Sequence, residues 1–176
     1  MCGICGKLVF SDTEPLPNYA LIKRMCDVIV YRGPDSQGIV ELGKAGLGAR
    51  RLSIIDLSTG NQPQANEDKS IWVTFNGEIY NFRELRQDMI KKGHQLTTYS
   101  DTEVLVHLYE EYGDGFVEQC NGMFAFCIYD VKRNRMLLAR DRLGKKPLFY
   151  FMNDRFFIFG SELKTFINLS PLIIWW

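Results

Sequence analysis

Four short apolar segments in the second half of the chain constrain the fold most strongly. They span residues 123–129, 136–140, 147–151 and 155–159, and polar turns of a few residues separate them. Consecutive positions within each segment are apolar instead of alternating, which indicates strands that are covered on both faces. The gaps are too short for helical crossovers, so neighbouring strands are expected to pair antiparallel. This pattern predicts two sheets stacked face to face with helices outside.

The first half of the chain supplies further strands and a first helix. Residues 3–10 are expected to form a buried strand, and apolar residues recur at helical spacing between Leu21 and Ile29. A polar loop rich in turn-forming residues follows at 31–38. Residues 71–75 form a β-rich run that ends at Asn76-Gly77.

Helical patterns follow that run. Phe82, Leu85, Met89 and Ile90 mark one amphipathic helix, and the capping box Ser100-Asp101-Thr102-Glu103 begins another. A final helix is expected from Ser161-Glu162. The predicted class is therefore α+β, with mostly antiparallel sheets.

Length and charge narrow the classes of function. A chain of 176 residues predicts one domain. Its 21 basic and 21 acidic side chains balance, which argues against nucleic acid or an anionic membrane as the main partner. No apolar stretch is long enough to span a bilayer, and the first residues lack the features of a secretory signal. We therefore expect a cytoplasmic protein.

The cysteines argue against a disulfide framework, because their number, five, is odd and no secretory signal is evident. Cys2 and Cys5 form a CxxC pair, which leaves a zinc or redox module as one alternative. A structural zinc site needs four ligands, usually in two close pairs. The remaining candidates offer no second pair at ligand spacing, so no metal is predicted: Cys26, Cys120, Cys127, His94 and His107.

Cys2 is a candidate nucleophile. Removal of Met1 would leave Cys2 as the first residue, and its free α-amine could then act as the general base for its own thiol. This arrangement would need no histidine partner. The alternative is a buried structural cysteine in the first strand.

Other polar residues next to apolar runs fit the same chemistry. The Asn76 amide and a backbone N–H of Gly77 could stabilise an oxyanion, although Asn-Gly is also a common turn. Arg51 could bind a carboxylate through two hydrogen bonds. Asp101 could hold an ammonium group, or could simply favour the start of a helix. Residues 32–38 could form an ordering loop or a substrate lid.

Together these residues belong to an ordered series of motifs. The motifs are Met1-Cys2-Gly3-Ile4, Arg32-Gly33-Pro34-Asp35, Arg51-Leu52-Ser53-Ile54-Ile55-Asp56, Asn76-Gly77-Glu78-Ile79-Tyr80-Asn81, Ser100-Asp101-Thr102-Glu103, Gly122-Met123-Phe124-Ala125-Phe126, Arg140-Asp141-Arg142-Leu143-Gly144 and Ser161-Glu162-Leu163-Lys164. The series closely resembles the glutaminase domain of glutamine-hydrolysing asparagine synthetases. These are class II glutamine amidotransferases, a branch of the N-terminal nucleophile (Ntn) hydrolases. The resemblance covers residues 2–168, and residues 169–176 form an atypical apolar tail.

The resemblance implies a four-layer αββα sandwich and a glutaminase activity. Cys2 would attack the side-chain amide of L-glutamine, and Asn76 with Gly77 would form the oxyanion hole. Arg51 would bind the substrate α-carboxylate. Backbone groups of Leu52, Ser53, Ile54 and Ile55 would assist Arg51, while Glu78 and Asp101 would hold the α-ammonium group.

The resemblance also implies what acts with this domain. An ammonia-accepting synthetase domain or subunit would be the partner, and ATP and Mg²⁺ would belong to that part, because this chain lacks its Ser-Gly-Gly-x-Asp-Ser loop. The sequence leads us to expect a chain that is truncated before that domain and lacks the last strands of its own. A truncated or split-gene fragment acting as a binding or regulatory subunit, an amidotransferase with another acceptor, and a homodimer remain open.

Overall fold

The computed structural model describes residues 1–53, 56 and 58–167, and its first sheet is built around the N-terminal strand. Strand β1 (Gly3–Val9) lies at the centre of five strands, and all seven of its residues are buried. The order across the sheet is β2 (Ser36–Leu42), β3 (Ala45–Arg51), β1, β9 (Phe156–Gly160) and β8 (Phe149–Met152). Each neighbouring pair is antiparallel, and for the late strands β8 and β9 this confirms the prediction from their short gap.

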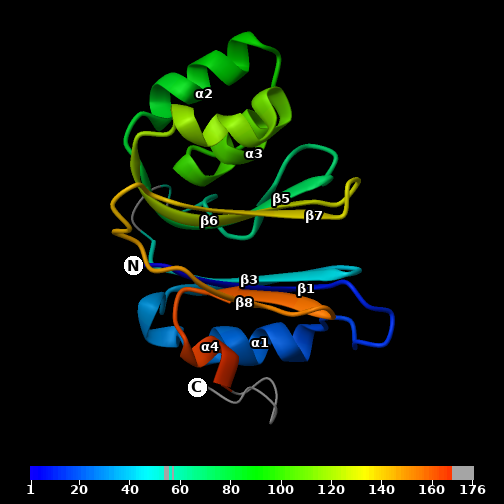
Figure 1. Cartoon of the computed structure of the whole chain (residues 1–176). Coiled ribbons are helices and arrows are strands. Elements are labelled where there is room, and N and C mark those ends of the chain that lie inside the picture. The colour runs from blue at the N-terminus through cyan, green and yellow to red at the C-terminus, as the bar shows by residue number, and fades with distance from the viewer. Residues whose placement is uncertain (54–55, 57, 168–176) are drawn as a thin grey trace.

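The second sheet has four antiparallel strands. Their order is β4 (Gln64–Ala65), β5 (Ile71–Ile79), β6 (Gly122–Asp130) and β7 (Arg135–Arg140). Strands β5 and β6 pair along their full nine residues. In Figure 1 this sheet lies above the first one, face to face with it.

Helices cover the outer faces of both sheets, which confirms the predicted four-layer αββα class (Figure 1). Helices α1 (Tyr19–Asp27) and α4 (Lys164–Ile167) lie on the first sheet. Helix α3 (Asp101–Tyr112) lies on the second sheet, and α2 (Phe82–Lys91) packs against α3. Two 3₁₀ turns complete the described elements, η1 (Val30–Arg32) and η2 (Gly113–Gln119).

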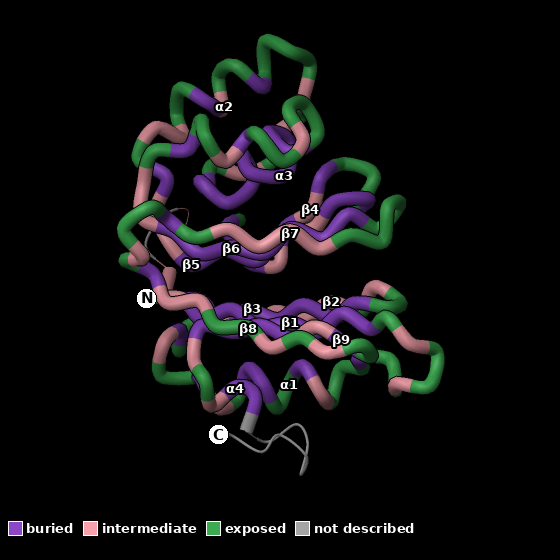
Figure 2. The backbone as a smooth tube through the Cα atoms, in the orientation of Figure 1, coloured by how far each residue is buried: buried purple, intermediate pink, exposed green. Residues whose placement is uncertain are grey.

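Three apolar cores separate the four layers, and they explain the unbroken apolar runs. Side chains alternate between the two faces of a strand, so β1 sends Ile4 into the core between the sheets and Cys5 into the core beneath α1. The third core lies between the second sheet and helices α2 and α3. The buried segments in Figure 2 follow these three interfaces.

Asn76-Gly77 is not the strand-ending turn that its local pattern favours. The two residues lie inside β5, where they pair with Ala125 and Phe124 of β6. The cross-strand pairing outweighs the turn preference of the dipeptide. Strands β2 and β3 were also not predicted, because β3 is rich in glycine and alanine, which give a weak strand signal.

Two further features bear on the sequence predictions. Within residues 1–53, 56 and 58–167, every helix is too short or too polar to cross a lipid bilayer. The predicted tail at 169–176 lies outside the residues that the structure describes.

Candidate functional site

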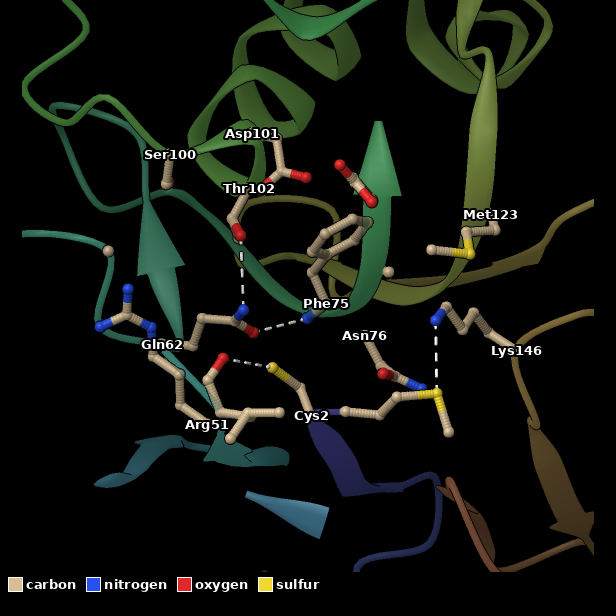
Figure 3. A pocket seen from close by; sticks show the side chains of 15 residues that line it. Cys2, Arg51, Gln62, Phe75, Asn76, Ser100, Asp101, Thr102, Met123 and Lys146 are labelled. Atoms are coloured by element: carbon tan, nitrogen blue, oxygen red, sulfur yellow. Dashed lines mark hydrogen bonds between the residues drawn. The ribbon is translucent and has the colours of Figure 1, made fainter. Parts of the chain in front are cut away.

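A pocket opens where the chain enters β1, between the ends of the two sheets (Figure 3). Its volume is about 90 Å³. It is lined by segments that lie far apart in the sequence: Met1, Cys2, Arg51, Leu52, Gly60, Gln62, Phe75, Asn76, Gly77, Glu78, Ser100, Asp101, Thr102, Met123 and Lys146. The pocket thus brings together seven of the ten residues predicted for the site.

Cys2 immediately precedes β1 and is half-buried at the pocket wall. Its Sγ lies 3.7 Å from the carbonyl oxygen of Leu52, a bond drawn in Figure 3. Arg32 holds the backbone of this residue, because its Nε donates to the Cys2 carbonyl oxygen at 3.0 Å. Arg32 is in turn paired with Glu162 at 3.0 Å. The segment predicted as an ordering loop therefore anchors the cysteine backbone.

Asn76 is buried, and its Nδ2 has no hydrogen-bond partner among the described residues. An unsatisfied buried amide is costly. A pocket that presents such a donor is suited to a ligand oxygen.

Gly77 places a backbone N–H at the same pocket. Strand β4 pairs with one edge of β5 at Trp72 and Val73. Beyond these two residues, side chains accept hydrogen bonds from the N–H groups of the same edge. Gln62 Oε1 accepts from the N–H of Phe75 at 2.7 Å, and an Asp101 oxygen accepts from the N–H of Ile79 at 3.0 Å. Alternate N–H groups of a strand point to one edge, so the Gly77 N–H lies between these two and faces the pocket.

The pairing with β6 gives the same direction for the N–H group of Gly77. Its partner Phe124 donates to Asp141, and the Phe124 carbonyl oxygen accepts from the N–H of Asp141 at 2.8 Å. The polar backbone groups of Phe124 are thus directed at β7, away from Gly77. Glycine is also required here, because a Cβ would lie 2.3 Å from the carbonyl oxygen of Met123.

Asp101 is a buried carboxyl group at the first turn of α3. Ser100 caps this helix, because its side chain accepts from the N–H of Glu103. Burial raises the pKa of Asp101 to about 6, and the nearby Glu78 also raises it. Both side chains line the pocket, so a cation placed there would face two carboxyl groups.

Arg51 ends β3 and is buried, with its guanidinium group held by the loop that follows. It donates to Asn61 Oδ1 at 3.3 Å and to the carbonyl oxygen of Asp56. Gly60 makes room for it, because a Cβ at this position would lie 2.5 Å from Arg51 Nη2. Asp56 accepts hydrogen bonds from the N–H groups of Thr59 and Tyr99 and from the Thr59 hydroxyl group. The bond from the hydroxyl group is the main cause that lowers the pKa of Asp56 to about 2.

The segment after Arg51 is only partly placed. Leu52 lines the pocket, whereas the N–H of Ser53 donates to Asp35 at 2.7 Å and Ser53 does not line the pocket. The predicted residues Ile54 and Ile55 lie outside the residues that the structure describes.

Gln62 is a site residue that the sequence did not single out. Its Oε1 accepts a hydrogen bond from the N–H of Phe75 in β5, and its Nε2 donates to Thr102 at 3.3 Å. Gln62 therefore connects the edge of β5 at the pocket to helix α3. No local pattern marks an isolated glutamine for this role, which depends on a contact between distant segments.

Lys146 was also missed, although the motif that positions it was noted. Asp141 accepts from three N–H groups that follow it, ending with that of Lys146 at 3.1 Å. Burial alone would raise the pKa of Asp141, but these backbone hydrogen bonds lower it. The Lys146 side chain is buried, and its Nζ lies 3.3 Å from Met1 Sδ in the pocket (Figure 3).

The CxxC pair does not act as a unit. Cys5 lies in the core beneath α1, where its Sγ is 3.5 Å from that of Cys26, while Cys2 lines the pocket. The hydrogen bond with Cys26 and burial raise the pKa of Cys5 well above its usual value. This geometry argues against a zinc or redox module built on Cys2 and Cys5.

Comparisons with known proteins agree with this architecture. Asparagine synthetase [glutamine-hydrolyzing] 2 of Bacillus subtilis is 45% identical over 169 residues, which cover 96% of this chain and 22% of that protein. The asparagine synthetase [glutamine-hydrolyzing] of Asparagus officinalis is 44% identical over 149 residues, covering 85% of this chain and 25% of the relative. The chain thus spans about a quarter of the length of these relatives.

A solved structure shares the fold. Glutamine phosphoribosylpyrophosphate amidotransferase from B. subtilis superposes with a TM-score of 0.78 at 22% identity, covering 96% of this chain and 43% of that one. This likeness confirms the predicted sandwich fold. A family model for the glutamine amidotransferase domain matches residues 1–172. The chain therefore belongs to the glutamine amidotransferase domain family.

Proposed function

We propose that this chain hydrolyses the side-chain amide of L-glutamine through a thioester on Cys2 and supplies the ammonia for asparagine synthesis. One observation carries the proposal: a single pocket gathers a thiol, a guanidinium group, a buried carboxyl group and a buried amide whose nitrogen has no partner in the described part of the chain. The curated relatives named as glutamine-hydrolysing asparagine synthetases support the ammonia acceptor. That acceptor would be a synthetase domain or subunit, to which ATP and Mg²⁺ belong.

The pocket can orient an amino acid by its two charged ends. Arg51 would bind the α-carboxylate with its guanidinium group, with backbone of the following segment assisting. Asp101 and Glu78 would hold the α-ammonium group at the opposite wall. Such charge-assisted bonds would direct the side-chain amide of glutamine towards Cys2.

Acylation would begin once Met1 has been removed. The Cys2 thiol passes its proton to its own α-amine, and Sγ bonds to the amide carbon of glutamine. The carbonyl electron pair moves to oxygen, which accepts hydrogen bonds from Asn76 Nδ2 and the Gly77 N–H. Collapse re-forms the carbonyl and breaks the carbon–nitrogen bond, and the ammonium proton transfers to the departing nitrogen. Ammonia leaves and a glutamyl thioester remains.

Deacylation would use the same groups in reverse. Water gives a proton to the α-amine of Cys2 and bonds to the thioester carbon, and the same two donors stabilise the second oxyanion. The carbon–sulfur bond then breaks, the sulfur recovers a proton, and glutamate leaves. Asn76 and Gly77 therefore act in both halves of the reaction.

We predict that glutaminase activity requires both Cys2 and a free N-terminus. The chain with Met1 removed should release glutamate from glutamine, and Cys2→Ala should be slower by at least about 10³-fold, because no thioester can form. The matched control carries a removable extension before Cys2. It should be inactive until a protease exposes Cys2, as assayed by glutamate release and intact mass. Equal turnover before and after cleavage would contradict the proposal.

Gly60→Ala tests the position of the guanidinium group without removing it. The added Cβ would displace Arg51 from the geometry of the loop, so KM for glutamine should rise about tenfold or more with a smaller change in kcat. Gly115→Ala is the matched control, since its Cβ meets nothing within 4 Å. Steady-state kinetics measure both. An unchanged KM in Gly60→Ala would exclude Arg51 as the carboxylate-binding group.

The titration of Asp101 predicts opposite effects on activity and stability. Its carboxylate is needed to bind the ammonium group, so kcat/KM for glutamine should fall by about tenfold per pH unit below a pKa near 6. Asp101→Asn should be poorly active throughout and lack this limb of the profile.

Stability should respond to the same group in the opposite direction. The folded pKa is raised above the unfolded value, so the native state binds the proton more tightly. The native state therefore loses stability as pH rises from about 4 to about 6, and the loss stays constant at higher pH. Denaturant unfolding at about pH 7.5 should therefore show Asp101→Asn to be more stable than the parent by up to about 3 kcal/mol. The difference should vanish below about pH 4. A destabilised variant at neutral pH would refute this account of Asp101.

A further inference from the structure

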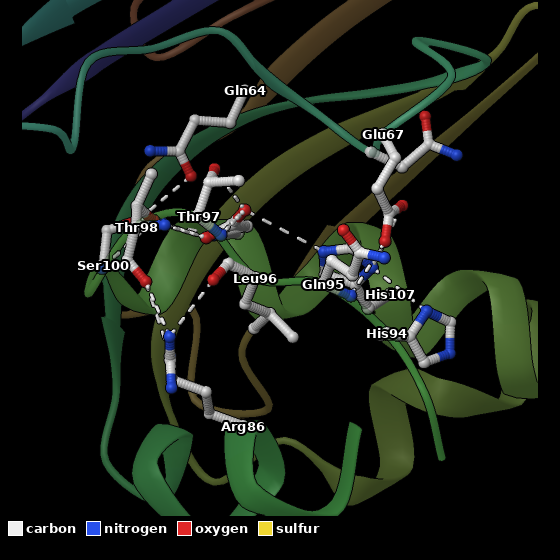
Figure 4. Close-up of polar contacts among 12 residues, drawn as sticks. Gln64, Glu67, Arg86, His94, Gln95, Leu96, Thr97, Thr98, Ser100 and His107 are labelled. Atoms are coloured by element: carbon white, nitrogen blue, oxygen red, sulfur yellow. Dashed lines mark hydrogen bonds and ion pairs between the residues drawn. The ribbon is translucent and has the colours of Figure 1, made fainter. Parts of the chain in front are cut away.

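His94, His107 and Glu67 offer ligand atoms that all lie within 4.8 Å of one another, beside the helix layer of the second sheet (Figure 4). Glu110 contacts both histidines there, and the place is separate from the Cys2 pocket. Glu67 comes from the turn between β4 and β5, and His94 from the loop between α2 and α3. His107 and Glu110 lie one turn apart on α3. These two histidines are the only ones in the sequence.

The distances among the polar atoms of His94, His107 and Glu110 match a metal-coordination shell, and Glu67 lies slightly further out. The Nδ1 atoms of His94 and His107 are 3.2 Å apart. Glu110 Oε2 lies 3.2 Å from His107 Nδ1 and 3.5 Å from His94 Nδ1, which completes a nearly equilateral triangle. Glu67 Oε2 lies 3.9 Å from His107 Nδ1. A tetrahedral zinc ion with bonds of about 2.0–2.1 Å has ligand atoms about 3.3 Å apart.

In three of these side chains, the nitrogen or oxygen atom that does not face the centre of the cluster contacts a partner outside it. His94 Nε2 contacts Glu111 Oε1 at 3.0 Å, which fixes Nδ1 towards the centre. Glu67 Oε1 accepts from the N–H of Gln95 at 2.9 Å, and Glu110 Oε1 accepts from Asn66 Nδ2 at 2.8 Å. Metal-binding histidines and carboxylates are oriented by outer partners of this kind.

His107 adds an independent observation, because its side chain is fully buried. Its Nδ1 points into the cluster, while its Nε2 has no hydrogen-bond partner among the described residues. The nearest carboxylate oxygen to Nε2, Glu103 Oε1, is 4.0 Å away. The Nδ1 atom of this buried imidazole thus faces another imidazole nitrogen and two carboxylates, which are the surroundings of a metal ligand.

Charge balance also favours a divalent cation. If one Nδ1 atom carries a proton, that proton can make a hydrogen bond to only one of the facing atoms. If both Nδ1 atoms carry protons, the two N–H groups point at each other. Two neutral imidazoles and two carboxylates instead carry a charge of −2, which a divalent ion neutralises. Imidazole ligands suit zinc and neighbouring transition metals, whereas magnesium and calcium prefer all-oxygen sites.

We propose that His94, His107, Glu110 and Glu67 bind one divalent transition-metal ion of the zinc class. The ion would tie the α2–α3 loop and the β4–β5 turn to helix α3. Its role would be structural, because all four ligands come from the protein and the site is separate from the pocket of Cys2. The inference does not depend on the proposed glutaminase activity.

Zinc titration of the metal-free Cys2→Ala chain tests the proposal. Cys2 is replaced because a free N-terminal thiol would itself bind zinc. In competition with a chromophoric chelator, the protein should bind one equivalent of zinc, and zinc should raise its Tm. Cobalt substituted at the site should give the visible absorption of a tetrahedral complex. No stoichiometric binding would overturn the proposal.

Variants locate the ion within the chain. His94→Gln and Glu110→Gln should each weaken zinc binding by at least about tenfold and reduce the rise in Tm. Glu118→Gln is the control, since it removes one negative charge from an exposed residue of η2. Circular dichroism without metal verifies that each variant is folded. Binding as tight in both ligand variants as in Glu118→Gln would assign the zinc elsewhere and contradict the proposal.

Discussion

The edge of β5 that faces the pocket is the constraint on which the site depends. Strand β4 pairs with it only as far as Val73 in the described structure, and its next N–H groups must find other acceptors. Gln62 and Asp101 supply two of them, so the loop before β4 and the start of α3 are held against the strand. Gly77 lies between these contacts. The N–H groups of this edge need acceptors, and the side chains that supply them join the loop before β4 and helix α3 to the strand. The Gly77 N–H, which lies between them, faces the pocket.

The layered fold could be predicted because it depends on burial, which a sequence records directly. Segments 123–129 and 155–159 are apolar at consecutive positions since each strand packs against a sheet on one face and helices on the other. Strand β3 was missed because Gly48 keeps α1 close to the sheet; a Cβ there would lie 2.6 Å from Cys26 Sγ. The local pattern of Asn76-Gly77 favoured a turn, but these residues lie within β5 because their pairing with β6 outweighs that preference.

Site residues differ in how far their own pattern reveals them. Cys2, Arg51 and Asp101 could be proposed from residue chemistry and from the order of the motifs. Gln62 and Lys146 could not, because each reaches the pocket through contacts with distant segments. The histidine cluster was not predicted from the sequence for the same reason. Its ligands come from three segments without the close pairs that mark common zinc sites, and only folding brings their Nδ1 and Oε2 atoms together.

A nucleophile at the N-terminus is the central claim, and covalent labelling tests it most directly. A glutamine analogue with an electrophilic carbon at the amide position should alkylate the chain with exposed Cys2 once, and glutamine should protect against it. Peptide mass spectrometry should place the adduct on Cys2. The chain that retains an extension before Cys2 should react far more slowly. An adduct on Cys120 or another buried cysteine, or equal labelling of the extended chain, would contradict the account.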